Sequence, residues 1–326
     1  MAFGLWRPEA YQGARRRRDY FEGWYFKQVT RDLEESWSFI PGVARGRRPG
    51  EGYSFVQAIE GRTARSFWFE FPLSAFSASR RELSVRVGGC EFSRSGLRLD
   101  LSSQEGRFEG EIGFGPPTLL PSPLLSPGVM GPYSFVPFME CRHGLVSLHH
   151  GLSGSLRHDG RPIDFAGGRG YAEKDWGRSM PESWLWTQSN NFPDEGDSFM
   201  LSVARIPWLG GSFTGFLCAA SLGGRLLREA SYTGARLRLL EADEASARVV
   251  VERGGERIKE RIEARIARAR GGSLRAPVDG LLSRRIAESV DAVLELEWSK
   301  GGRTLFSGRA PKAGLEIVGD VPALRA

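Results

Sequence analysis

The chain has 326 residues, of which 40% are hydrophobic and 26% are charged, and its 45 basic and 39 acidic residues give a formal net charge of +6. These values are typical of a globular protein and exclude a wholly disordered or fibrous chain. The 42 Gly and 18 Pro favour many short strands joined by turns over long helices. The length allows about two domains, each with its own core.

The cysteines and the N-terminus bear on the compartment. Cys90, Cys141 and Cys218 form no C-x-x-C pair, which argues against a disulfide framework and favours a reducing compartment. No signal-length apolar stretch opens the chain, and no apolar run reaches the length of about 18 residues that a transmembrane helix needs. We therefore predict a cytoplasmic protein with a flexible tail at residues 1–20. The basic cluster Arg15–Arg18 is either solvated or in peripheral contact with a membrane surface.

Short aromatic or β-branched segments bounded by Gly, Ser or Pro predict the strands of the first half. They are Glu22–Val29, Tyr53–Glu60, Ser66–Phe71, Leu83–Val87, Gly96–Leu101 and Arg107–Phe114. Residues 115–137 contain seven prolines, too many for a central strand, and are predicted to be a long crossing segment. We expect residues 21–140 to form the N-terminal β domain.

Residues 141–326 are predicted to form a second β domain. Its predicted strands are Leu145–Leu156, Ile163–Tyr171, Ser183–Phe192, Phe199–Ile206, Phe213–Leu222, Ala247–Glu252, Glu256–Ala269, Ala292–Trp298 and Thr304–Ser307. The segment 256–269 shows both helical and strand spacing, but the preceding glycine pair at 254–255 is typical of a hairpin turn and favours a strand. The fold class is therefore all-β, as two consecutive barrels or sandwiches with little helix.

A carboxylate among aromatic residues marks the first predicted strand. Alternation along residues 20–27 places Glu22, Trp24 and Phe26 on one face and Tyr25 on the other. Aromatic neighbours desolvate a carboxylate, which raises its pKa and lets it hold a proton near neutral pH. The alternative is a charged residue at the rim of a barrel, paired with an arginine.

Alternating charges mark a second segment. Between Tyr171 and Trp176 the chain carries Glu173, Lys174 and Asp175, and an extended conformation puts the two carboxylates on one face. Two close carboxylates share a proton, so the pKa of one of them rises. Such a pair is a candidate general acid.

The strand that follows carries Trp184, Trp186, Gln188 and Asn190 on one face. An aromatic wall that ends in two amides is a natural lining for an apolar pocket with a few orienting polar groups. The alternative is a tryptophan-rich core whose amides bind backbone groups.

Four histidines and a cysteine lie close together, at Cys141, His143, His149, His150 and His158. Their spacing matches no familiar zinc site, so no metal is predicted. We expect His150 to line the pocket as a proton relay.

Three other function classes are excluded by context. The glycines at 167–170 precede a charged strand and not a helix, which excludes a dinucleotide fingerprint. Ser147, Ser153 and Ser179 lack the strand–turn–helix surroundings of a nucleophile elbow, which argues against that class of hydrolase. Clustered basic residues alternating with aromatic ones are missing, so nucleic acid is not an expected partner.

Four segments carry a resemblance to a known family. They are YFEGWYFK at Tyr20–Lys27, GYAEKDWGRSMPESWLWTQSNNF at Gly170–Phe192, LRAP at Leu274–Pro277 and AGLEIVG at Ala313–Gly319. In this order they resemble the tocopherol cyclase family. The resemblance implies a pair of lipocalin-like β-barrel halves and a prenylated hydroquinone as the small hydrophobic substrate. It also implies that a protonated prenyl double bond is captured by a phenolic oxygen to give a chromanol, without a cofactor.

Protonation of an alkene requires a strong acid in a dry pocket, and aromatic faces stabilise the cation that forms. The resemblance implies that plant members of the family have Asn where this chain has Asp175. Because an amide cannot donate the proton, this favours Glu173 as the proton donor and Asp175 as its modulator. Glu22 is the remaining acid candidate. The predicted substrate-binding residues are Trp24, Tyr25, His150, Tyr171, Trp176, Trp184, Trp186, Gln188 and Asn190, with the two amides on the phenol oxygens.

Two alternatives stay open at this point. A lipocalin-like barrel can carry isoprenoid or quinone ligands without any chemistry. A hydratase similar to carotenoid hydratases would add water to the same kind of cation. A carrier needs apolar walls only, so a buried carboxyl that opens into the main cavity would distinguish an enzyme from a carrier.

Overall fold

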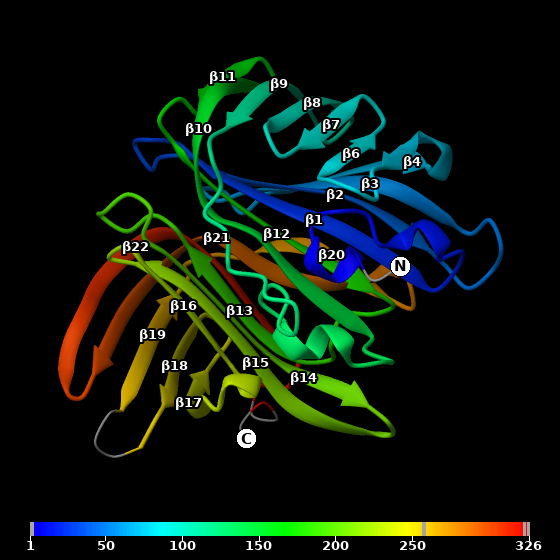
Figure 1. Cartoon of the computed structure of the whole chain (residues 1–326). Helices are drawn as coiled ribbons and strands as arrows, with labels where there is room; N and C mark the ends of the chain where they lie inside the picture. The colour runs from blue at the N-terminus through cyan, green and yellow to red at the C-terminus, as the bar shows by residue number, and fades with distance from the viewer. Residues whose placement is uncertain (1–2, 256–258, 322–323, 325–326) are drawn as a thin grey trace.

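A computed structural model describes residues 3–255, 259–321 and 324 (Figure 1). Its first sheet contains β1 (Tyr20–Val29), β2 (Ser36–Arg45), β3 (Gly52–Glu60), β4 (Ser66–Pro72), β5 (Phe76–Ala78), β6 (Ser84–Val87), β7 (Cys90–Ser93), β8 (Gly96–Ser103), β9 (Gly106–Phe114), β10 (Cys141–His158), β11 (Arg161–Asp164) and β12 (Arg169–Gly177). Neighbouring strands follow the order β4-β3-β2-β1-β12-β10-β9-β8-β7-β6-β5, with β11 paired to β10.

The second sheet contains β13 (Trp184–Ser189), β14 (Ser198–Trp208), β15 (Gly211–Leu222), β16 (Arg225–Ala230), β17 (Arg236–Ala242), β18 (Ser246–Arg253), β19 (Glu260–Ala267), β20 (Gly272–Val278), β21 (Leu281–Lys300) and β22 (Arg303–Val318). Its order is β16-β15-β14-β13-β22-β21-β19-β18-β17, with β20 paired to β21. The described helices are short 3-10 turns: η1 (Phe3–Trp6), η2 (Gly13–Arg15), η3 (Leu73–Ala75), η4 (Gly131–Phe135) and η5 (Ser231–Thr233). The prediction of an all-β fold with two lipocalin-like halves is confirmed.

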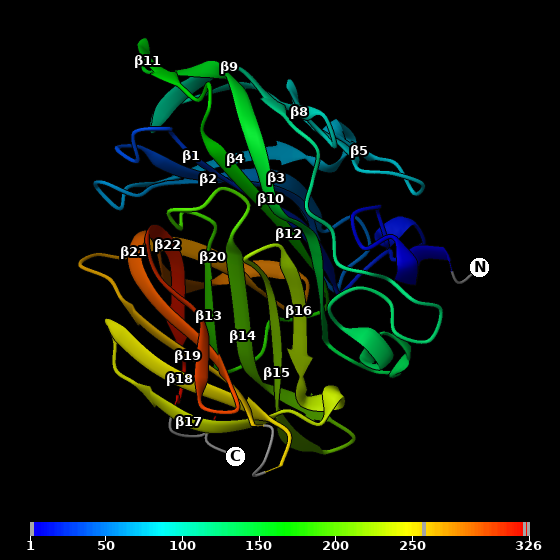
Figure 2. The same ribbon diagram turned by 60° about the vertical axis from the view of Figure 1, so that its left-hand side comes forward.

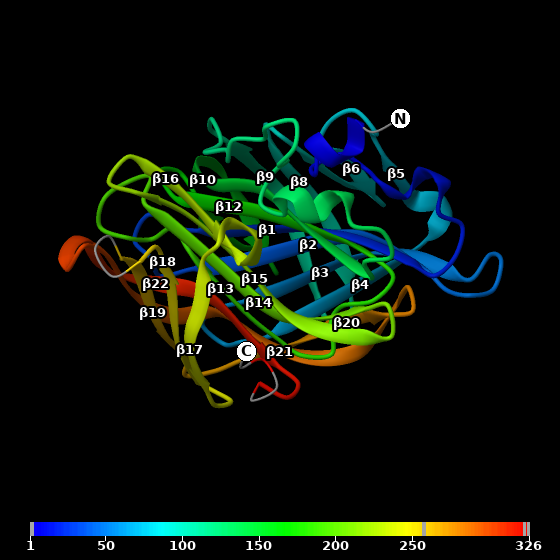
Figure 3. The same ribbon diagram turned by 60° about the horizontal axis from the view of Figure 1, so that its bottom comes forward.

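Side-chain alternation gives the molecule three apolar layers. The first half encloses a core that includes Trp24 and Phe26, and the second half encloses one that includes Leu185. A third cluster, which includes Tyr25 and Trp186, lies where the two sheets face each other. In Figure 3 the strands β13–β15 cross in front of β1–β4, which shows this face-to-face arrangement. Each strand at the junction therefore contributes one face to its own core and the other to the space between the halves.

The sheets divide the chain at a different point from the one expected. Strands β10–β12, which follow residue 140, pair within the first sheet, and the second sheet begins at Trp184. The predicted strand Ile163–Tyr171 is two strands, because β11 ends at Asp164 and a turn precedes β12. We propose residues 178–183 as the boundary between the halves.

The ambiguous segment 256–269 is a strand where it is described. Strand β19 (Glu260–Ala267) pairs antiparallel with β18, in agreement with the hairpin prediction. Residues 256–258 lie outside the described residues.

The N-terminal segment is packed and is not a free tail. The Ala10 side chain is fully buried, and the backbone N–H of Tyr11 donates to the carbonyl of Ser79 (2.8 Å). Arg15–Arg18 remain exposed. In the described ranges we find no helical segment with the length and hydropathy that crossing a bilayer requires.

Candidate functional site

A cavity of about 170 Å³ lies between the two sheets. Most of its wall is apolar and comes from both halves, with Tyr25 and Ile40 on the first sheet and Trp184 and Trp186 on the second. Four carboxyl groups also line it, those of Glu173, Asp175, Glu288 and Glu316. An apolar cavity with a few convergent ionisable groups is the arrangement expected of a binding or catalytic site.

Glu173 stands in β12 between Tyr25 of β1 and Leu145 of β10. Glu173 is only 5% exposed. Its Oε2 accepts hydrogen bonds from the Tyr171 hydroxyl and from Trp186 Nε1 (3.1 Å). Burial raises the pKa of Glu173 to about 7, although the nearby His143 opposes the shift. A substantial fraction of this carboxyl is therefore protonated at neutral pH.

His143 of β10 joins the two carboxylates of β12. Its Nδ1 lies 3.0 Å from Oδ1 of Asp175, and its Nε2 lies 3.4 Å from Oε2 of Glu173. Burial disfavours the charged imidazole, but Asp175 and Glu173 outweigh it and raise the pKa of His143 to about 9. The imidazolium thus links a carboxylate to the carboxyl that faces the cavity.

The same three groups bear on metal binding. His143, Glu173 and Asp175 each bring one ligand atom within 4.8 Å of the others. However, the two ring nitrogens of His143 each face a different carboxylate, whereas a metal ion requires one nitrogen and the carboxylates to converge on a single point. The geometry is that of a hydrogen-bonded chain, and we derive no metal chemistry from it.

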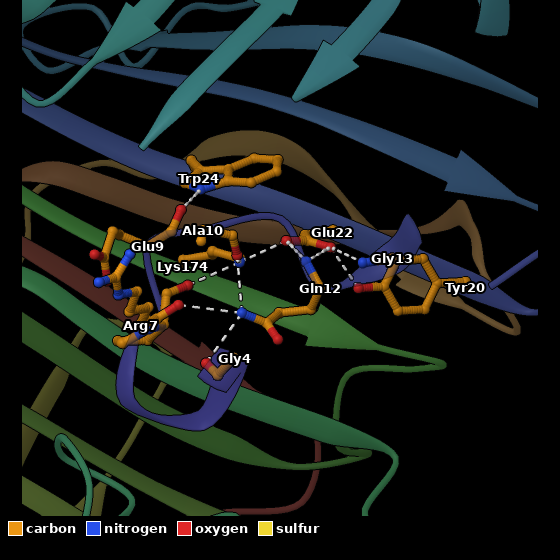
Figure 4. A network of polar contacts seen from close by, with 11 residues as sticks. Gly4, Arg7, Glu9, Ala10, Gln12, Gly13, Tyr20, Glu22, Trp24 and Lys174 are labelled. Carbon is orange, nitrogen blue, oxygen red and sulfur yellow. Dashed lines mark hydrogen bonds and ion pairs between the residues drawn. The ribbon is translucent and has the colours of Figure 1, made fainter. Parts of the chain in front are cut away.

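Glu22 does not line the cavity and belongs to the polar network drawn in Figure 4, on the opposite face of the sheet. Its carboxylate accepts hydrogen bonds from the backbone N–H groups of Gln12 and Gly13, each at 2.9 Å, and from the Tyr20 hydroxyl. It also forms an ion pair with Lys174 Nζ (2.5 Å), and both side chains are fully buried. Alternation along β1 causes this placement, because Glu22 and Tyr25 point to opposite faces. Glu22 is therefore not proposed as the acid of the cavity.

The predicted pocket residues Trp24 and Trp176 lie on this opposite face as well. Lys174 Nζ stands 4.8 Å from the ring centroid of Trp24 and 4.7 Å from that of Trp176. It also donates to the carbonyls of Pro8 (2.8 Å) and Ala10 (2.5 Å). These contacts hold the N-terminal segment against the back of the sheet (Figure 4).

The amides of Gln188, in β13, and Asn190, just after its end, bind protein groups and not the cavity. Gln188 Oε1 accepts from the buried Lys27 Nζ (2.9 Å), and Asn190 Nδ2 donates to the carbonyl of Gly170 (2.7 Å). Buried amides require such partners, and these partners come from the facing sheet. The predicted contact of the amides with phenol oxygens is not supported by this placement.

His150 also lies away from the cavity wall. Its ring packs 4.5 Å from that of Phe114, and its Nδ1 lies 3.0 Å from Oγ of Ser147. Burial lowers the pKa of His150 to about 3, so it is neutral at physiological pH. The histidine at the cavity is His143, at the start of β10, before the predicted beginning of that strand.

The structure thus brings one group of predicted residues together at the cavity. They are Tyr25, Tyr171, Glu173, Asp175, Trp184 and Trp186, with Tyr171 joined through its bond to Glu173. The residues that sequence reasoning missed are His143, Glu288 and Glu316. Fold and site define an all-β protein of two lipocalin-like halves with a carboxyl-lined apolar cavity between them.

Sequence comparisons agree with the predicted resemblance. The tocopherol cyclase-like family model matches residues 126–210. Tocopherol cyclase, chloroplastic, of Zea mays is 25% identical over 237 residues, which are 57% of this chain and 49% of that protein. Probable tocopherol cyclase, chloroplastic, of Oryza sativa subsp. japonica is 35% identical over 69 residues, 21% of this chain and 14% of that protein. The resemblance to this family is confirmed, although the chain spans half or less of the length of these curated relatives.

Solved structures share the fold. CghA has a TM-score of 0.59 at 11% identity, covering 92% of this chain and 89% of that chain. A putative AttH from Nitrosomonas europaea has a TM-score of 0.52 at 13% identity, covering 91% and 92%. Kievitone hydratase from Nectria haematococca has a TM-score of 0.50 at 11% identity, covering 92% and 89%. At these identities the likeness concerns the arrangement of the two halves.

Proposed function

We propose that the protein is an acid-catalysed enzyme that cyclises a prenylated hydroquinone to a chromanol, with Glu173 as the proton donor. The observation that carries the proposal is a buried carboxyl, that of Glu173, in an apolar cavity walled by Tyr25, Trp184 and Trp186. A carrier of apolar ligands gains nothing from such a carboxyl, since burying it costs free energy. An enzyme that protonates a double bond requires it.

The proposed reaction begins with transfer of the Glu173 proton to the prenyl double bond nearest the aromatic ring. A tertiary cation forms next to the indole rings of Trp184 and Trp186, whose faces stabilise positive charge. The apolar walls keep out water that would quench the cation. A phenolic oxygen then closes on the cation, and the product has the same composition as the substrate.

His143 and Asp175 are proposed to act on Glu173. When Glu173 gives up its proton, its carboxylate faces the His143 imidazolium at 3.4 Å, and this attraction stabilises the charged state. Asp175, 3.0 Å from the other ring nitrogen, fixes the orientation of the imidazole. This role agrees with the prediction that Asp175 modulates Glu173. The proposal differs in that Asp175 acts through His143, which lies between the two carboxyl groups.

The surface beside the cavity supports peripheral contact with a membrane. The side chains of Phe138 and Leu209 are 78% and 71% exposed. Trp208 Nε1 donates a hydrogen bond to the carbonyl of Pro137 (3.2 Å), and this bond joins the end of β14 to the segment before β10. Arg16 lines the same groove as Phe138. We define Phe138, Trp208, Leu209 and Arg15–Arg18 as the rim. In Figures 1 and 2 the N-terminal segment lies beside the η4 segment that precedes β10. Apolar and basic groups together suit an anionic lipid surface.

The test is incubation of purified protein with a panel of prenylated hydroquinones in detergent, with products identified by mass spectrometry and by their chromanol absorbance. A chromanol isomeric with its substrate is the expected result. A product heavier by one water would replace the cyclase with a hydratase. Tightly bound but unchanged ligand would replace it with a carrier. Omitting metal and adding a chelator should leave the rate unchanged, because the proposed steps use side chains only.

A further inference from the structure

Two carboxyl groups of the second sheet face the cavity and have no role in the steps above. Glu288 of β21 and Glu316 of β22 are cross-strand neighbours, and Glu316 is also paired with Trp186 of β13. Both line the cavity that Glu173 enters from the first sheet. The acid and this carboxyl pair therefore stand on opposite walls of one site.

The contacts of the pair indicate that it holds a single proton. Glu288 is fully buried, and its Oε1 accepts a hydrogen bond from the Tyr25 hydroxyl (2.7 Å). Its Oε2 receives no hydrogen bond from any described residue, as expected for an oxygen that itself carries a proton and donates to Glu316. Glu316 Oε2 accepts from Trp184 Nε1 (2.5 Å). Glu288 is thus the protonated member, and Glu316 is the carboxylate.

Burial and the charge of Glu316 raise the pKa of Glu288 well above its ordinary value, which agrees with this assignment. Burial raises the pKa of Glu316 as well, so its carboxylate is a stronger base than an ordinary glutamate. Two adjacent buried carboxyls titrate as a unit, and the pair takes up its second proton more readily than a solvated carboxylate would.

We propose that the Glu288–Glu316 pair is the base of the reaction and accepts the phenolic proton as the ring closes. This role rests on the proposed function. The O–H bond of Glu173 breaks, and a C–H bond forms with the electron pair of the double bond. The phenolic O–H bond then breaks, a C–O bond forms with an oxygen lone pair, and the proton passes to Glu316. Water that enters as the product leaves returns this proton to Glu173, so no co-reactant is consumed.

The other ionisable groups of the cavity are less suited to this step. His143 has its pKa raised to about 9 by Asp175 and Glu173, against the effect of burial, so it already holds its proton at neutral pH. Asp175 is engaged by His143 Nδ1 at 3.0 Å. Both lie on the same wall as the acid, whereas a substrate held between the sheets presents its other side to Glu316.

The test is Glu316→Gln, assayed with a substrate of the active panel in deuterated water. Without the base, Glu173 still delivers deuterium to the double bond, but the cation loses a proton again and does not close. We expect chromanol formation to fall by at least about 100-fold, while deuterium still enters recovered substrate and its double-bond isomers. Glu316→Asp should restore part of the ring closure. Glu288→Gln, which keeps a neutral donor beside Glu316 but removes the shared proton, should lose less ring closure than Glu316→Gln.

Glu297→Gln, an exposed glutamate of the same strand β21, is the matched control and should behave as wild type. Chromanol formation by Glu316→Gln at the wild-type rate would overturn the base role and leave the proposed function intact. Equal loss of ring closure and deuterium uptake in a folded Glu316→Gln protein would also overturn it. If the wild-type protein forms no chromanol from any substrate, the proposed function and the base role both fall.

Discussion

The chemistry of the site depends on one residue, Glu173, whose environment keeps it partly protonated. The carboxyl is buried between the sheets, and Tyr171 and Trp186 satisfy its oxygen without supplying a full positive charge. His143 is the cation that limits how far its pKa rises. The balance between burial and this imidazolium sets the pH range in which the acid is available.

The pH dependence of the cyclisation rate follows from this balance. Burial raises the pKa of Glu173 to about 7, and only the protonated form is active. The rate should therefore fall by about tenfold per pH unit above that pH. Initial rates of chromanol formation from pH 5 to 9 check this. A rate that increases between pH 7 and 9 would contradict Glu173 as the acid.

Removal of the His143 imidazolium should raise the pH at which the cyclisation rate begins to fall. In His143→Asn the positive charge that favours the Glu173 carboxylate is lost, so the pKa of Glu173 rises and the fall in rate begins at higher pH. The same rate measurements detect the shift. Arg17→Gln, which removes an exposed cation outside the cavity, is the control and should not change the pH at which the rate falls. A downward shift in His143→Asn is inconsistent with the account.

Sequence reasoning found Glu173 because alternating charges between aromatic residues are unusual. It missed Glu288 of β21 and Glu316 of β22 because each is a single glutamate in a strand that also carries apolar and charged residues in the ordinary way of a half-exposed strand. Their burial depends on the apposition of the first sheet, which no local pattern encodes. Glu22 shows the converse, since its aromatic surroundings were recognised but its partner Lys174 was not.

At the scale of single elements, β1 and β12 connect the cavity to the N-terminal segment. Glu173 and Asp175 face the cavity, while Lys174 between them points to the other side and joins Glu22. The carbonyls of Pro8 and Ala10 complete the contacts of the ammonium group. The N-terminal segment therefore contributes to the stability of the strand that carries the acid.

The stability of the fold should depend strongly on this buried pair. Lys174→Met leaves the Glu22 carboxylate buried without its cation and should lower the free energy of unfolding by about 3–5 kcal/mol. The double variant Glu22→Gln/Lys174→Met should lose less than the sum of the single losses. Urea unfolding measures both. Lys300→Met, which removes a half-exposed lysine paired with Glu260, should cost about 1 kcal/mol or less. Equal losses for the two lysines would contradict the account.

Strand β2 shows why some elements escaped prediction. It contains Pro41 and Gly42, which interrupt the usual strand pattern, yet it lies between β1 and β3. Its pairing with β1 stops between Phe39 and Gly42, where proline offers no N–H to the ladder. The strands flanked by clear turns, such as β8 and β9, were predicted correctly because local propensity and alternation agree there.

At the scale of the whole molecule, the cavity exists only where the two halves meet. Tyr25 and Glu173 come from the first sheet, and Trp184, Trp186 and Glu316 from the second. A two-half β fold was predictable from turn density and strand spacing. The face-to-face packing that makes the site was not, because it depends on contacts between strands far apart in the chain.

The rim should bind membranes that carry anionic lipid. Arg15–Arg18 supply the charge, and Phe138 and Leu209 supply the apolar contact. In vesicle sedimentation, we expect more binding to vesicles with phosphatidylserine than to phosphatidylcholine alone. Phe138→Ser/Leu209→Ser should weaken binding about tenfold. Leu305→Ser, at an exposed leucine of β22 outside the rim, should have no effect. Equal binding of both variants would contradict this surface.

The central claim is that Glu173 protonates a prenyl double bond, and incorporation of deuterium from deuterated water tests it most directly. The wild-type protein should place one non-exchangeable deuterium in each product molecule. The deuterium should sit on the ring carbon adjacent to the carbon that carries the new C–O bond. Glu173→Gln should lose both this label and the product, whereas Glu297→Gln should retain both. Labelled product formed by Glu173→Gln at the wild-type rate would contradict the account.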